Sequence, residues 1–313
     1  MSSPSVAAIV LSYDGRDVTL QALESLTALA HEPLQLVVVD NGSVDGTREA
    51  VEAGFPGVVV VRSEENLGPA GGVNLGLRWA LVRGFDYYLV LNNDIEVAPD
   101  MVGEMLIVAE RDPEIGIVGP KAYYYEDRNR IWAAGDLIQF RESVTKPRGH
   151  REIDRGQYDR TEEVPYVNGC AMLIHRRVLE DVGLWDPIYF LSVEDADFCM
   201  RAKRAGYSCW YAPRARLWHM VSVTAGGYRP GRTYHTGRST ALFLRRYATL
   251  WQWVTATAFT LAALPVAFLR ELPRGNQRAV IAKARGFRDG LREPMTAPPT
   301  APNVEAGTSG GNG

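Results

Sequence analysis

The sequence has few cysteines. Of its 313 residues only three are cysteines, Cys170, Cys199 and Cys209. They are odd in number and lack the spacing of metal ligands, which argues against a disulfide framework and against a zinc site. We therefore expect reduced thiols in a protein core, as in a cytosolic protein.

The sequence also lacks an excess of charge of one sign. Its 34 Lys and Arg nearly balance its 37 Asp and Glu, which gives a formal net charge of −3. A protein that coats nucleic acid normally carries a clear positive excess. This balance argues against a nucleic-acid partner.

The N-terminus lacks the pattern of a secretory signal, because no charged segment is followed by a long apolar run and a cleavage site. We therefore expect the catalytic part to face the cytosol. What the sequence does have is an ordinary globular composition, with 46% hydrophobic and 23% charged residues. At this length it predicts one large domain, or one domain with an appendage.

Short apolar runs alternate with helical patterns in the first hundred residues. The runs cover 6–12, 34–40, 58–61 and 87–91, and they are typical of buried parallel strands. The connections between runs and helical patterns are short, which indicates βαβ crossovers. The sequence therefore predicts an α/β fold of nucleotide-binding character, with ligands at the carboxyl edge of a mostly parallel sheet.

Beyond residue 96 the pattern is mixed. We expect a helix over 99–110 and strands over 116–125 and 167–175. The polar, charged and turn-rich stretch 135–158 predicts a long, partly mobile insertion.

The C-terminal third contains a long uncharged run, residues 247–269. Within it, 250–269 has roughly the 20 residues needed to span a bilayer, although polar residues dilute it and Pro265 interrupts it. Residues 270–293 contain seven Lys or Arg against three Asp or Glu, a balance that favours anionic lipid. Three interpretations stay open: a helix lying in or dipping into the membrane, a true span, and a buried soluble helix.

The stretch 183–198 ends in three carboxylates after an aromatic, proline-containing loop. Ser192, three residues before Asp195, predicts an N-cap and capping box for a helix that stops at Gly206. In the first turn of that helix the dipole favours ionised Asp195. An ionised carboxylate at a cleft edge suits a general base that takes a proton from an alcohol. Taken alone, the stretch is equally consistent with an ordinary helix start that contains acidic residues and has no catalytic role.

Two polar clusters follow predicted strands. Asp40 opens the segment 40–47 between a strand and a helix, where a carboxylate can bind a base or a ribose. Asn92, Asn93 and Asp94 follow the fourth strand, where one carboxylate can hold a magnesium ion that keeps water and phosphate as its other ligands. For each cluster taken alone, a plain turn remains an alternative.

Two weaker signals accompany these clusters. The segment 66–72 precedes a helix and is rich in glycine, so its backbone N–H groups could cradle a phosphate. It is neither a P-loop nor the dinucleotide-binding pattern. His219 lies in a short apolar stretch, where a histidine is more often a core residue than a ligand. It becomes a candidate ligand only beside a metal or a diphosphate at Asp94.

Taken in order, the segments of the first half resemble the family 2 glycosyltransferases of the GT-A fold. Residues 37–47 match the family's base-binding segment, and 66–74 resemble its asparagine- and glycine-rich stretch beside the donor. Residues 89–94 occupy the place of the metal-binding Asp-x-Asp. The chain departs from the family at Asn92, where the family often has Asp, so its metal site would hold one carboxylate fewer.

Segments in the second half of the chain resemble the acceptor-binding half of the same family. Residues 168–172, 183–186 and 194–197 look like the family's acceptor-side segments with its catalytic base. Residues 131–135 resemble a segment of the bacterial rhamnosyltransferase-like branch. The resemblance covers roughly residues 5–225.

The resemblance implies an inverting glycosyltransferase that uses a nucleoside-diphosphate sugar, such as dTDP-rhamnose or a UDP-sugar, and a divalent cation, Mg²⁺ or Mn²⁺. Asp195 would be the catalytic base, Asp94 with His219 would hold the metal, and Asp40 would hold the base or ribose. Glu194 and Asp197 would orient Asp195 or bind the acceptor. The residues expected to bind substrate are Ser12, Tyr13, Asp40, Asn41, Gly42, Asn66, Gly71, Gly72, Asn74, Asn92, Asn93, Trp132, Gly135, Gly169, Trp185, Glu194 and Asp197.

We expect three parts in the chain. These are a GT-A catalytic domain over 1–235, a helical and membrane-associated region over 236–293, and a disordered tail over 294–313. The protein would be cytoplasmic, peripheral or C-terminally anchored at the inner face of the plasma membrane, and would act on a glycan or lipid-linked acceptor in cell-envelope polysaccharide synthesis. Two alternatives stay open, a nucleotidyltransferase without a base at Asp195 and a non-catalytic scaffold that binds sugar nucleotides.

Overall fold

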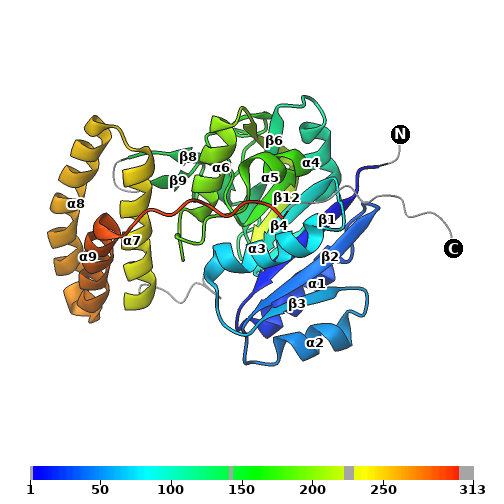
Figure 1. Cartoon of the computed structure of the whole chain (residues 1–313), viewed down its shortest axis with the longest axis horizontal. Helices are drawn as coiled ribbons and strands as arrows, with labels where there is room; N and C mark the ends of the chain where they lie inside the picture. The colour runs from blue at the N-terminus through cyan, green and yellow to red at the C-terminus, as the bar shows by residue number, and fades with distance from the viewer. Residues whose placement is uncertain (1–2, 141–143, 222–228, 303–313) are drawn as a thin grey trace.

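The structure, a computed structural model, describes residues 3–140, 144–221 and 229–302. Over these residues it consists of a twisted sheet covered by helices on both faces, with a group of three helices beside it (Figure 1). The strands are β1 (Val6–Ser12), β2 (Leu34–Asn41), β3 (Val59–Ser63), β4 (Tyr87–Asn92), β5 (Ile95–Val97), β6 (Ile115–Tyr124), β7 (Ile131–Ala134), β8 (Asp136–Ile138), β9 (Thr145–Pro147), β10 (Glu162–Glu163), β11 (Ala171–His175) and β12 (Ser208–His219). The helices are α1 (Arg16–Leu26), α2 (Thr47–Gly54), α3 (Gly68–Leu81), α4 (Met101–Ala109), α5 (Arg176–Val182), α6 (Glu194–Arg204), α7 (Pro230–Tyr247), α8 (Leu250–Glu271) and α9 (Gln277–Arg292), with a short 3₁₀ turn, Leu272–Arg274, after α8.

The main sheet is mixed but mostly parallel. Its order within the described residues is β10-β12-β6-β11-β4-β1-β2-β3, with β5 paired to β12 and β7 paired to β6. β4, β1, β2 and β3 run parallel, and β11 lies antiparallel between β4 and β6. The α/β class and the mostly parallel sheet are therefore as predicted, and the first four strands begin and end within two residues of the apolar runs that predicted them.

Both faces of the sheet are buried, which explains the continuous apolar runs. Along β1, Ala7 and Ile9 point into a core shared with α3, α5 and α6. The alternate residues, including Ala8 and Val10, point into a second core shared with α1 and α4. A strand with helices on both sides needs apolar residues at every position, so β1 does not alternate with polar residues.

The expected insertion at 135–158 contains regular structure. β8 and β9 form a two-stranded antiparallel sheet there, and residues 141–143 between them lie outside the described residues. The rest of the stretch is tied to the main sheet, because the buried Lys121 of β6 forms an ion pair with Asp154 at 3.0 Å.

The predicted capping box at Ser192 is wrong. The N-cap residue of α6 is Val193, whose φ of 64° lies in the left-handed region. No side chain at this position accepts a capping hydrogen bond from the backbone N–H groups of the first turn. Ser192 also has a positive φ of 74°, and its hydroxyl faces that of Thr236 on α7 at 3.3 Å. The helix itself ends at Arg204, just before Gly206, as predicted.

α7 and α9 cross at glycines. A Cβ on Gly286 would lie 1.9 Å from the carbonyl oxygen of Tyr234, and one on Gly237 would lie 2.1 Å from that of Lys283. Only glycine allows backbones to approach so closely. The Thr233 hydroxyl adds a hydrogen bond of 2.7 Å to the carbonyl of Ala279. These two helices therefore form one tightly packed pair.

Arg246, near the end of α7, joins this helical group to the sheet domain. Its guanidinium contacts Asp197 of α6 at 2.7 Å and Asp186 at 2.8 Å, and both carboxylates are buried. The hydroxyl of Tyr247 donates a further hydrogen bond of 2.7 Å to Asp197. Asp197 thus holds α7 in place.

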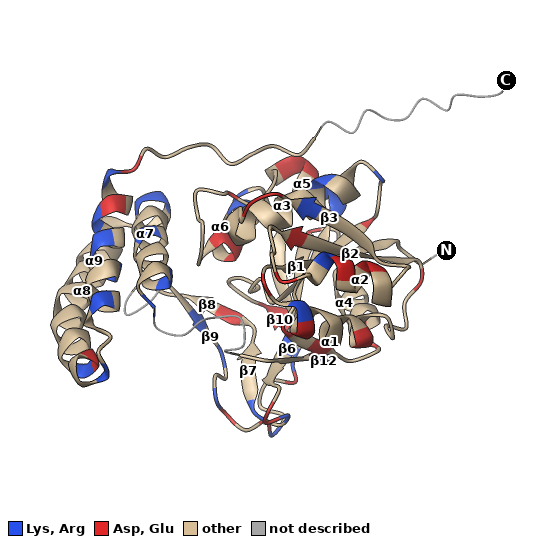
Figure 2. Ribbon diagram, turned by 90° about the horizontal axis from the view of Figure 1, so that it is seen from below, with Lys and Arg blue, Asp and Glu red and all other residues tan. Residues whose placement is uncertain are grey.

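α8 presents an apolar surface to solvent. It is the one helix in the described ranges that is long and apolar enough to cross a membrane, and only 6% of its most apolar window is buried. The large apolar side chains with the highest exposed fractions on it are those of Leu250, Trp251, Leu261, Val266 and Leu269. Lys and Arg mark α7 and α9 along their length, whereas α8 carries almost no charge (Figure 2).

The expected disordered tail differs from the structure at its start. Residues 294–302 run in an extended conformation from α9 back across the sheet domain (Figure 1). The carbonyl of Pro299 accepts a hydrogen bond of 2.9 Å from the backbone N–H of Leu184, and Ala301 packs against the core shared with α3 and α6. Residues 303–313 lie outside the described residues.

Candidate active site

Asp40, the second-last residue of β2, has a buried carboxylate with one oxygen that lacks a hydrogen-bond partner among the described residues. Its Oδ1 accepts a hydrogen bond of 2.9 Å from the backbone of Ser43, whereas its buried Oδ2 has no hydrogen-bond partner among the described residues. The nearest cation, Arg62 on β3, is 3.8 Å away. A buried acceptor without a donor is costly unless a ligand satisfies it. Asp40 is therefore well suited to bind a hydroxyl or an N–H group of a ligand.

Asn41 and Asn66 hold the glycine-rich segment in place. Asn41 accepts from the N–H of Leu67 at 3.1 Å and donates to Asn66, and Asn66 accepts from the N–H of Gly68 at 2.8 Å. Gly42 is required beside them, because it has a φ of 84° and its Cβ would lie 2.6 Å from the backbone of residue 65. These side chains brace the loop that borders the Asp40 carboxylate.

Gly71 and Gly72 lie in the first turns of α3, where they serve close packing. A Cβ on Gly72 would lie 2.4 Å from the side chain of Leu11, and one on Gly71 would lie 2.6 Å from that of Leu67. The absence of a side chain at Gly72 lets α3 lie directly on β1, and its absence at Gly71 leaves room for Leu67 at the start of α3.

Ser12, Thr19 and Asn93 form a buried polar cluster at the ends of β1 and β4. The two hydroxyls are 2.8 Å apart, and the Asn93 amide donates to Thr19 at 2.9 Å and to Ser12 at 3.3 Å. Asn93 is thus committed to the protein. Its neighbours in the predicted site, Asn92 and the exposed Tyr13, have no side-chain hydrogen bond in the described part of the chain and remain available to a ligand.

Asp94 and His219 lie together although 125 residues separate them. The antiparallel pairing of β5 with β12 places Ile95 opposite His219, and His219 Nε2 is 3.1 Å from Asp94 Oδ1. Both side chains are buried, and Nδ1 of His219 has no partner among the described residues. The Trp132 ring meets the imidazole edge-on at 4.4 Å.

This pair fits one side of a divalent-cation site. One carboxylate and one imidazole are acceptable ligands for Mn²⁺, and Mg²⁺ commonly takes few protein ligands and completes its shell with water and phosphate. No group of three or more His, Cys, Asp or Glu that could hold a metal occurs in the described part of the chain. A metal bound here would therefore need ligands from a substrate.

Asp195 lies in the first turn of α6, next to the loop that precedes β11. Its two oxygens accept hydrogen bonds from the N–H of Gly169 at 2.8 Å and from its neighbour Ala196 at 2.7 Å. Burial nevertheless outweighs these bonds and raises the pKa of Asp195. The expected preference for the ionised form is thus opposed by burial, and a raised pKa makes Asp195 a stronger base once it is ionised.

Glu194 is the second acid of the α6 start. It is buried, its Oε2 has no partner among the described residues, and burial together with the neighbouring Asp195 raises its pKa to about 8. Two successive residues before it, Ser192 and Val193, have positive φ angles. Such strain in non-glycine residues costs of the order of 1–3 kcal/mol each and persists only where the surroundings enforce it. The backbone here holds both carboxylates against the domain.

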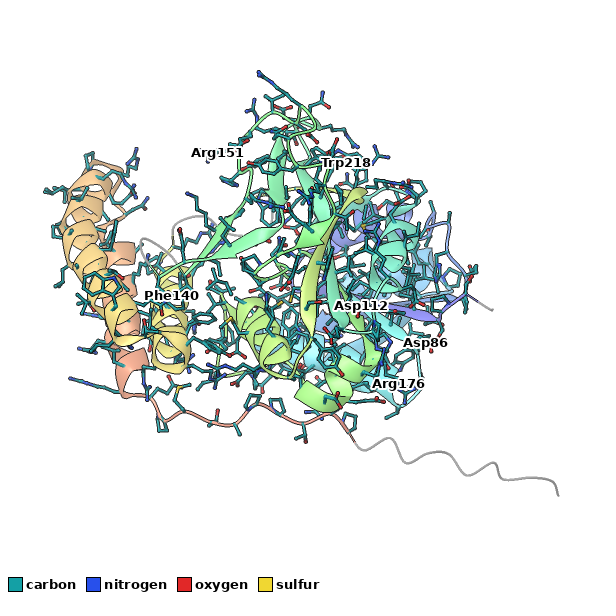
Figure 3. The ribbon with its side chains drawn as sticks, turned by 90° about the horizontal axis from the view of Figure 1, so that it is seen from above. Asp86, Asp112, Phe140, Arg151, Arg176 and Trp218 are labelled. Carbon is teal, nitrogen blue, oxygen red and sulfur yellow. The ribbon has the colours of Figure 1, made fainter. Side chains whose placement is uncertain are left out.

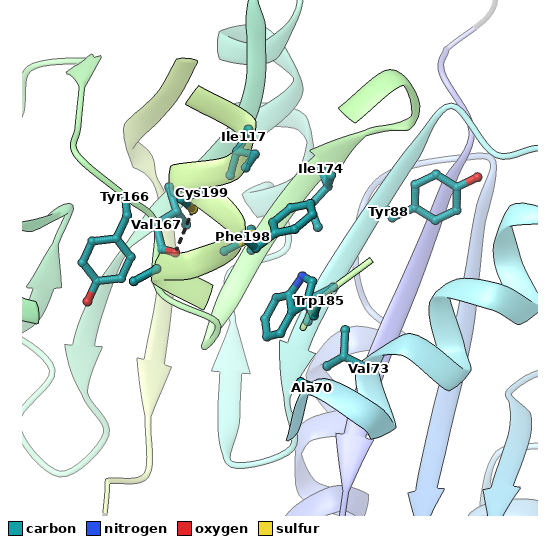
Figure 4. Close-up of a cluster of buried hydrophobic side chains, with 14 of the residues drawn as sticks. Ala70, Val73, Tyr88, Ile117, Tyr166, Val167, Ile174, Trp185, Phe198 and Cys199 are labelled. Atoms are coloured by element: carbon teal, nitrogen blue, oxygen red, sulfur yellow. Dashed lines mark hydrogen bonds between the residues drawn. The ribbon is translucent and has the colours of Figure 1, made fainter. Parts of the chain in front are cut away.

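Trp185 and Gly169 pack beside Asp195. A Cβ on Gly169 would lie 3.1 Å from the Trp185 ring and 3.6 Å from Cβ of Asp195. The Trp185 ring is buried and lies against Phe198 of α6 (Figure 4). Asn74 of α3 is bound to the Trp185 backbone through both atoms of its amide. Asn74 thus anchors the backbone of Trp185, whose ring packs beside Gly169 and Asp195.

Asp136 is a site residue that was missed in the sequence. Asn168 donates a hydrogen bond of 2.6 Å to its Oδ2, and its buried Oδ1 has no partner in the described residues. Burial raises its pKa to about 7, with a contribution from the nearby Asp195. Its one signal was its place after Gly135, which has a φ of 77° and was itself a predicted site residue.

Asn168 and Gly169 connect the two carboxylates. The side chain of Asn168 binds Asp136, and the next backbone N–H, that of Gly169, binds Asp195. The following residue, Cys170, accepts at its carbonyl from the N–H of Asn92, so this loop also touches the end of β4. The structure thereby gathers residues from β4, β8, α6 and β12 at one edge of the sheet.

Comparisons with known proteins agree on one family. The model of the family described as "Glycosyl transferase family 2" matches residues 7–183. An uncharacterized protein of Mycobacterium tuberculosis strain H37Rv is 31% identical over 187 residues, which are 58% of this chain and 66% of that protein. The chain thus spans just under two thirds of this relative. A protein of the same strain named N-acetylglucosaminyl-diphospho-decaprenol L-rhamnosyltransferase is 25% identical, covering 74% of this chain and 81% of its own.

Two solved structures share the fold. The mannosyltransferase PcManGT of Pyrobaculum calidifontis, solved with GDP-Man and Mn²⁺, has a TM-score of 0.58 at 19% identity and covers 92% of this chain and 88% of its own. GalNAc-T7, solved with UDP, GalNAc and Mn²⁺, has a TM-score of 0.66 at 15% identity and covers 93% of this chain and 56% of its own. The fold of the sheet domain is therefore of the GT-A type.

Proposed function

Because the chain belongs to glycosyl transferase family 2, we propose that it transfers a sugar from a nucleoside-diphosphate sugar to an acceptor hydroxyl with inversion. The observation that carries this proposal is the arrangement at the sheet edge. Asp40 lies at the carboxyl end of β2, the Asp94–His219 pair follows the carboxyl end of β4, and Asp195 is bound to the loop that touches the end of β4.

The donor side would be formed by the ends of β2 and β4. The free Oδ2 of Asp40 suits a hydrogen bond to the base or ribose of the nucleotide. Asp94 and His219 would hold a divalent cation, which neutralises charge on the leaving diphosphate when it is bound. Both solved structures contain Mn²⁺, which supports this part of the proposal.

Asp195 would act on the acceptor side as the general base. It accepts the proton of the acceptor hydroxyl while that oxygen forms a bond to the anomeric carbon and the bond from this carbon to the phosphate oxygen breaks. The nucleoside diphosphate leaves from the face opposite to attack, which inverts the anomeric configuration. Gly169 and Trp185 would keep Asp195 in the orientation that this step needs.

A lipid-linked glycan is the acceptor that the helical group supports best. The apolar surface of α8 would lie in the membrane interface, and the arginines of α7 and α9 would contact anionic lipid head groups. Arginines along two neighbouring helices would be costly inside a bilayer, so an interfacial position is favoured over a span. The relative named after N-acetylglucosaminyl-diphospho-decaprenol and rhamnose supports an acceptor and a donor of this kind in cell-envelope polysaccharide synthesis.

A product assay tests the proposal. The full chain is incubated with a panel of dTDP-, UDP- and GDP-sugars, Mn²⁺ and a membrane lipid extract, and both the released nucleotide and the lipid product are identified by mass spectrometry. Release of a nucleoside diphosphate with a sugar added to lipid is expected. Release of pyrophosphate would identify the rival nucleotidyltransferase, and binding of a nucleotide sugar without turnover would identify the scaffold.

A further inference from the structure

A groove separates α8 from the α7–α9 pair. It has a volume of about 490 Å³. Most of its lining is apolar, including Leu244, Ala256, Phe259, Leu264, Ala267 and Phe287. The groove is therefore suited to a flexible hydrocarbon chain rather than to a polar sugar.

The groove contains a cation without a partner. Lys283 of α9 lines it, and no carboxylate pairs with its ammonium group in the described part of the chain. Burial lowers the pKa of Lys283, because desolvation disfavours its charged form, and an anion beside it would offset this cost. Arg270 lines the same groove, but it is already paired with Glu271 at 2.9 Å. An apolar groove with one uncompensated ammonium group fits a lipid with an anionic head group.

The backbone of Lys283 lies where α9 crosses α7, close to the part of α7 that faces the sheet domain. The carbonyl of Lys283 meets α7 at Gly237, and the residue before Gly237, Thr236, faces Ser192 at 3.3 Å. Ser192 and Val193 also line the groove, and Asp195 follows two residues later. A series of contacts and chain neighbours thus leads from Lys283 through Thr236 and Ser192 to Asp195.

Phe140 closes the groove on the side of the sheet domain. It extends from the segment after β8 toward the helical group (Figure 3). Its ring lies 6.1 Å from that of Phe243 on α7, and its carbonyl accepts a hydrogen bond of 3.2 Å from Thr255 of α8. The groove is thus built jointly by the helical group and the sheet domain.

We propose that this groove binds the isoprenoid chain of a lipid diphosphate acceptor, with Lys283 at the phosphates and the acceptor sugar directed past Ser192 toward Asp195. This inference rests on the proposed function, which supplies the lipid-linked acceptor, and adds the site that holds it. The negatively charged diphosphate would pair with the ammonium group of Lys283. Hydrogen bonds between charged groups are about twice as strong as those between neutral groups.

Binding of farnesyl diphosphate to the full chain, measured by titration calorimetry, tests the proposal. Farnesol and inorganic pyrophosphate are titrated as the two halves of the probe. We expect farnesyl diphosphate to bind at least tenfold more tightly than either half. Lys283→Met should weaken farnesyl diphosphate about tenfold and leave farnesol unchanged, and Ala267→Trp should weaken both by filling the groove.

Two matched variants control for nonspecific effects. Arg285→Met removes an exposed cation from the same helix, and Ala262→Trp adds the same ring to an exposed position of α8 outside the groove lining. Both should bind farnesyl diphosphate as the unchanged protein does. Circular dichroism checks folding, and Ala284→Leu is a second groove-filling change if Ala267→Trp does not fold.

Three results would overturn the proposal. The first is that farnesyl diphosphate does not bind. The second is that Lys283→Met and both groove-filling variants bind it as tightly as the unchanged protein does. The third is that Asp94→Ala abolishes binding, because the diphosphate would then lie in the donor site. Nucleotide-sugar turnover is measured separately on the same proteins. A chain that binds farnesyl diphosphate but transfers no sugar would contradict the proposed function and leave the groove assignment intact.

Discussion

The amide of Asn74 exchanges two hydrogen bonds with the backbone of Trp185. Nδ2 donates to the carbonyl oxygen at 2.8 Å, and Oδ1 accepts from the N–H at 2.9 Å. These bonds join α3 to the loop that leads into α6. Each polar atom of the Asn74 amide is thereby hydrogen-bonded, so Asn74 fixes α3 and this loop relative to each other.

Replacing Asp94 should remove the metal-dependent part of the reaction. Asp94→Ala is expected to abolish sugar transfer and to weaken Mn²⁺-dependent binding of the nucleotide sugar, because His219 would be left as a single protein ligand. Calorimetry with and without Mn²⁺ measures the binding, and Asp100→Ala, an exposed acid beyond β5, is the control. Full activity of Asp94→Ala in EDTA would contradict the assignment.

Replacing Asp195 should affect rate far more than stability. Asp195→Asn keeps the shape and can still accept the hydrogen bond from Gly169, but it cannot take a proton. Loss of a general base costs on the order of 10² to 10⁴ in rate. We expect a folded protein that binds nucleotide sugar normally and turns over at least a hundredfold more slowly. Near-normal transfer by the folded variant would remove Asp195 from the mechanism.

Replacing Asp197, two residues along the chain, should affect stability more than rate. Its carboxylate is fully buried between Arg201 and Arg246. Loss of one partner from a buried ion pair costs about 3–5 kcal/mol. Asp197→Asn should therefore lower the melting temperature clearly, and the protein that remains folded should retain turnover. A stable but inactive Asp197→Asn protein would mean that Asp197, too, acts in the reaction.

Glu194 should make stability depend on pH. Its pKa is raised to about 8 in the folded protein, above the value near 4.3 of an unfolded chain. The folded state therefore binds the proton more tightly, so this contribution to stability is fully present below about pH 4.3 and is lost as pH rises toward 8. Glu194→Gln should raise the melting temperature relative to the unchanged protein more at pH 8 than at pH 5. An equal difference at both pH values would contradict the raised pKa.

The outer face of α8 should control membrane binding. Changing Trp251, Leu261 and Leu269 to Gln removes large exposed apolar side chains, and burial of each such side chain contributes about 1.5–3 kcal/mol. We expect at least a tenfold loss of binding to anionic vesicles in a sedimentation assay. Val44, Val82 and Ile107, exposed on the sheet domain, are changed to Gln as the control. Equal loss in both triple variants would argue against α8 as the contact.

The sheet could be predicted because its signals are local. β1, β2 and β4 are buried on both faces, and burial on both faces requires an unbroken apolar run. The residues at their ends were found for the same reason, since polar residues directly after such runs must lie at the carboxyl edge. This rule made Asp40 and Asp94 candidates, and the resemblance to the family then gave each of them an expected role.

The features that were missed depend on contacts between distant residues. Ser192 has the sequence of a helix cap, but Thr236 on α7 faces its hydroxyl. The pKa of Asp136 is raised by burial and by Asp195, 59 positions along the chain, against the lowering effect of its hydrogen bond with Asn168. The segment 294–302 is held through the backbone carbonyls of Thr296 and Pro299, and composition carries no signal for such bonds.

The extended segment 294–302 gives the helical group a second attachment point. α7 is fixed near its end by Arg246, and the chain leaving α9 is fixed at Leu184 through Pro299. A body attached at two points cannot pivot as a hinged lid does, so α8 stays at a fixed distance from Asp195. If α8 lies on the bilayer and Asp195 is the base, the enzyme would select acceptors by the distance between the bilayer and the acceptor hydroxyl. A glycan whose hydroxyl lies too near the bilayer, or too far from it, would not reach Asp195, whatever its chemistry.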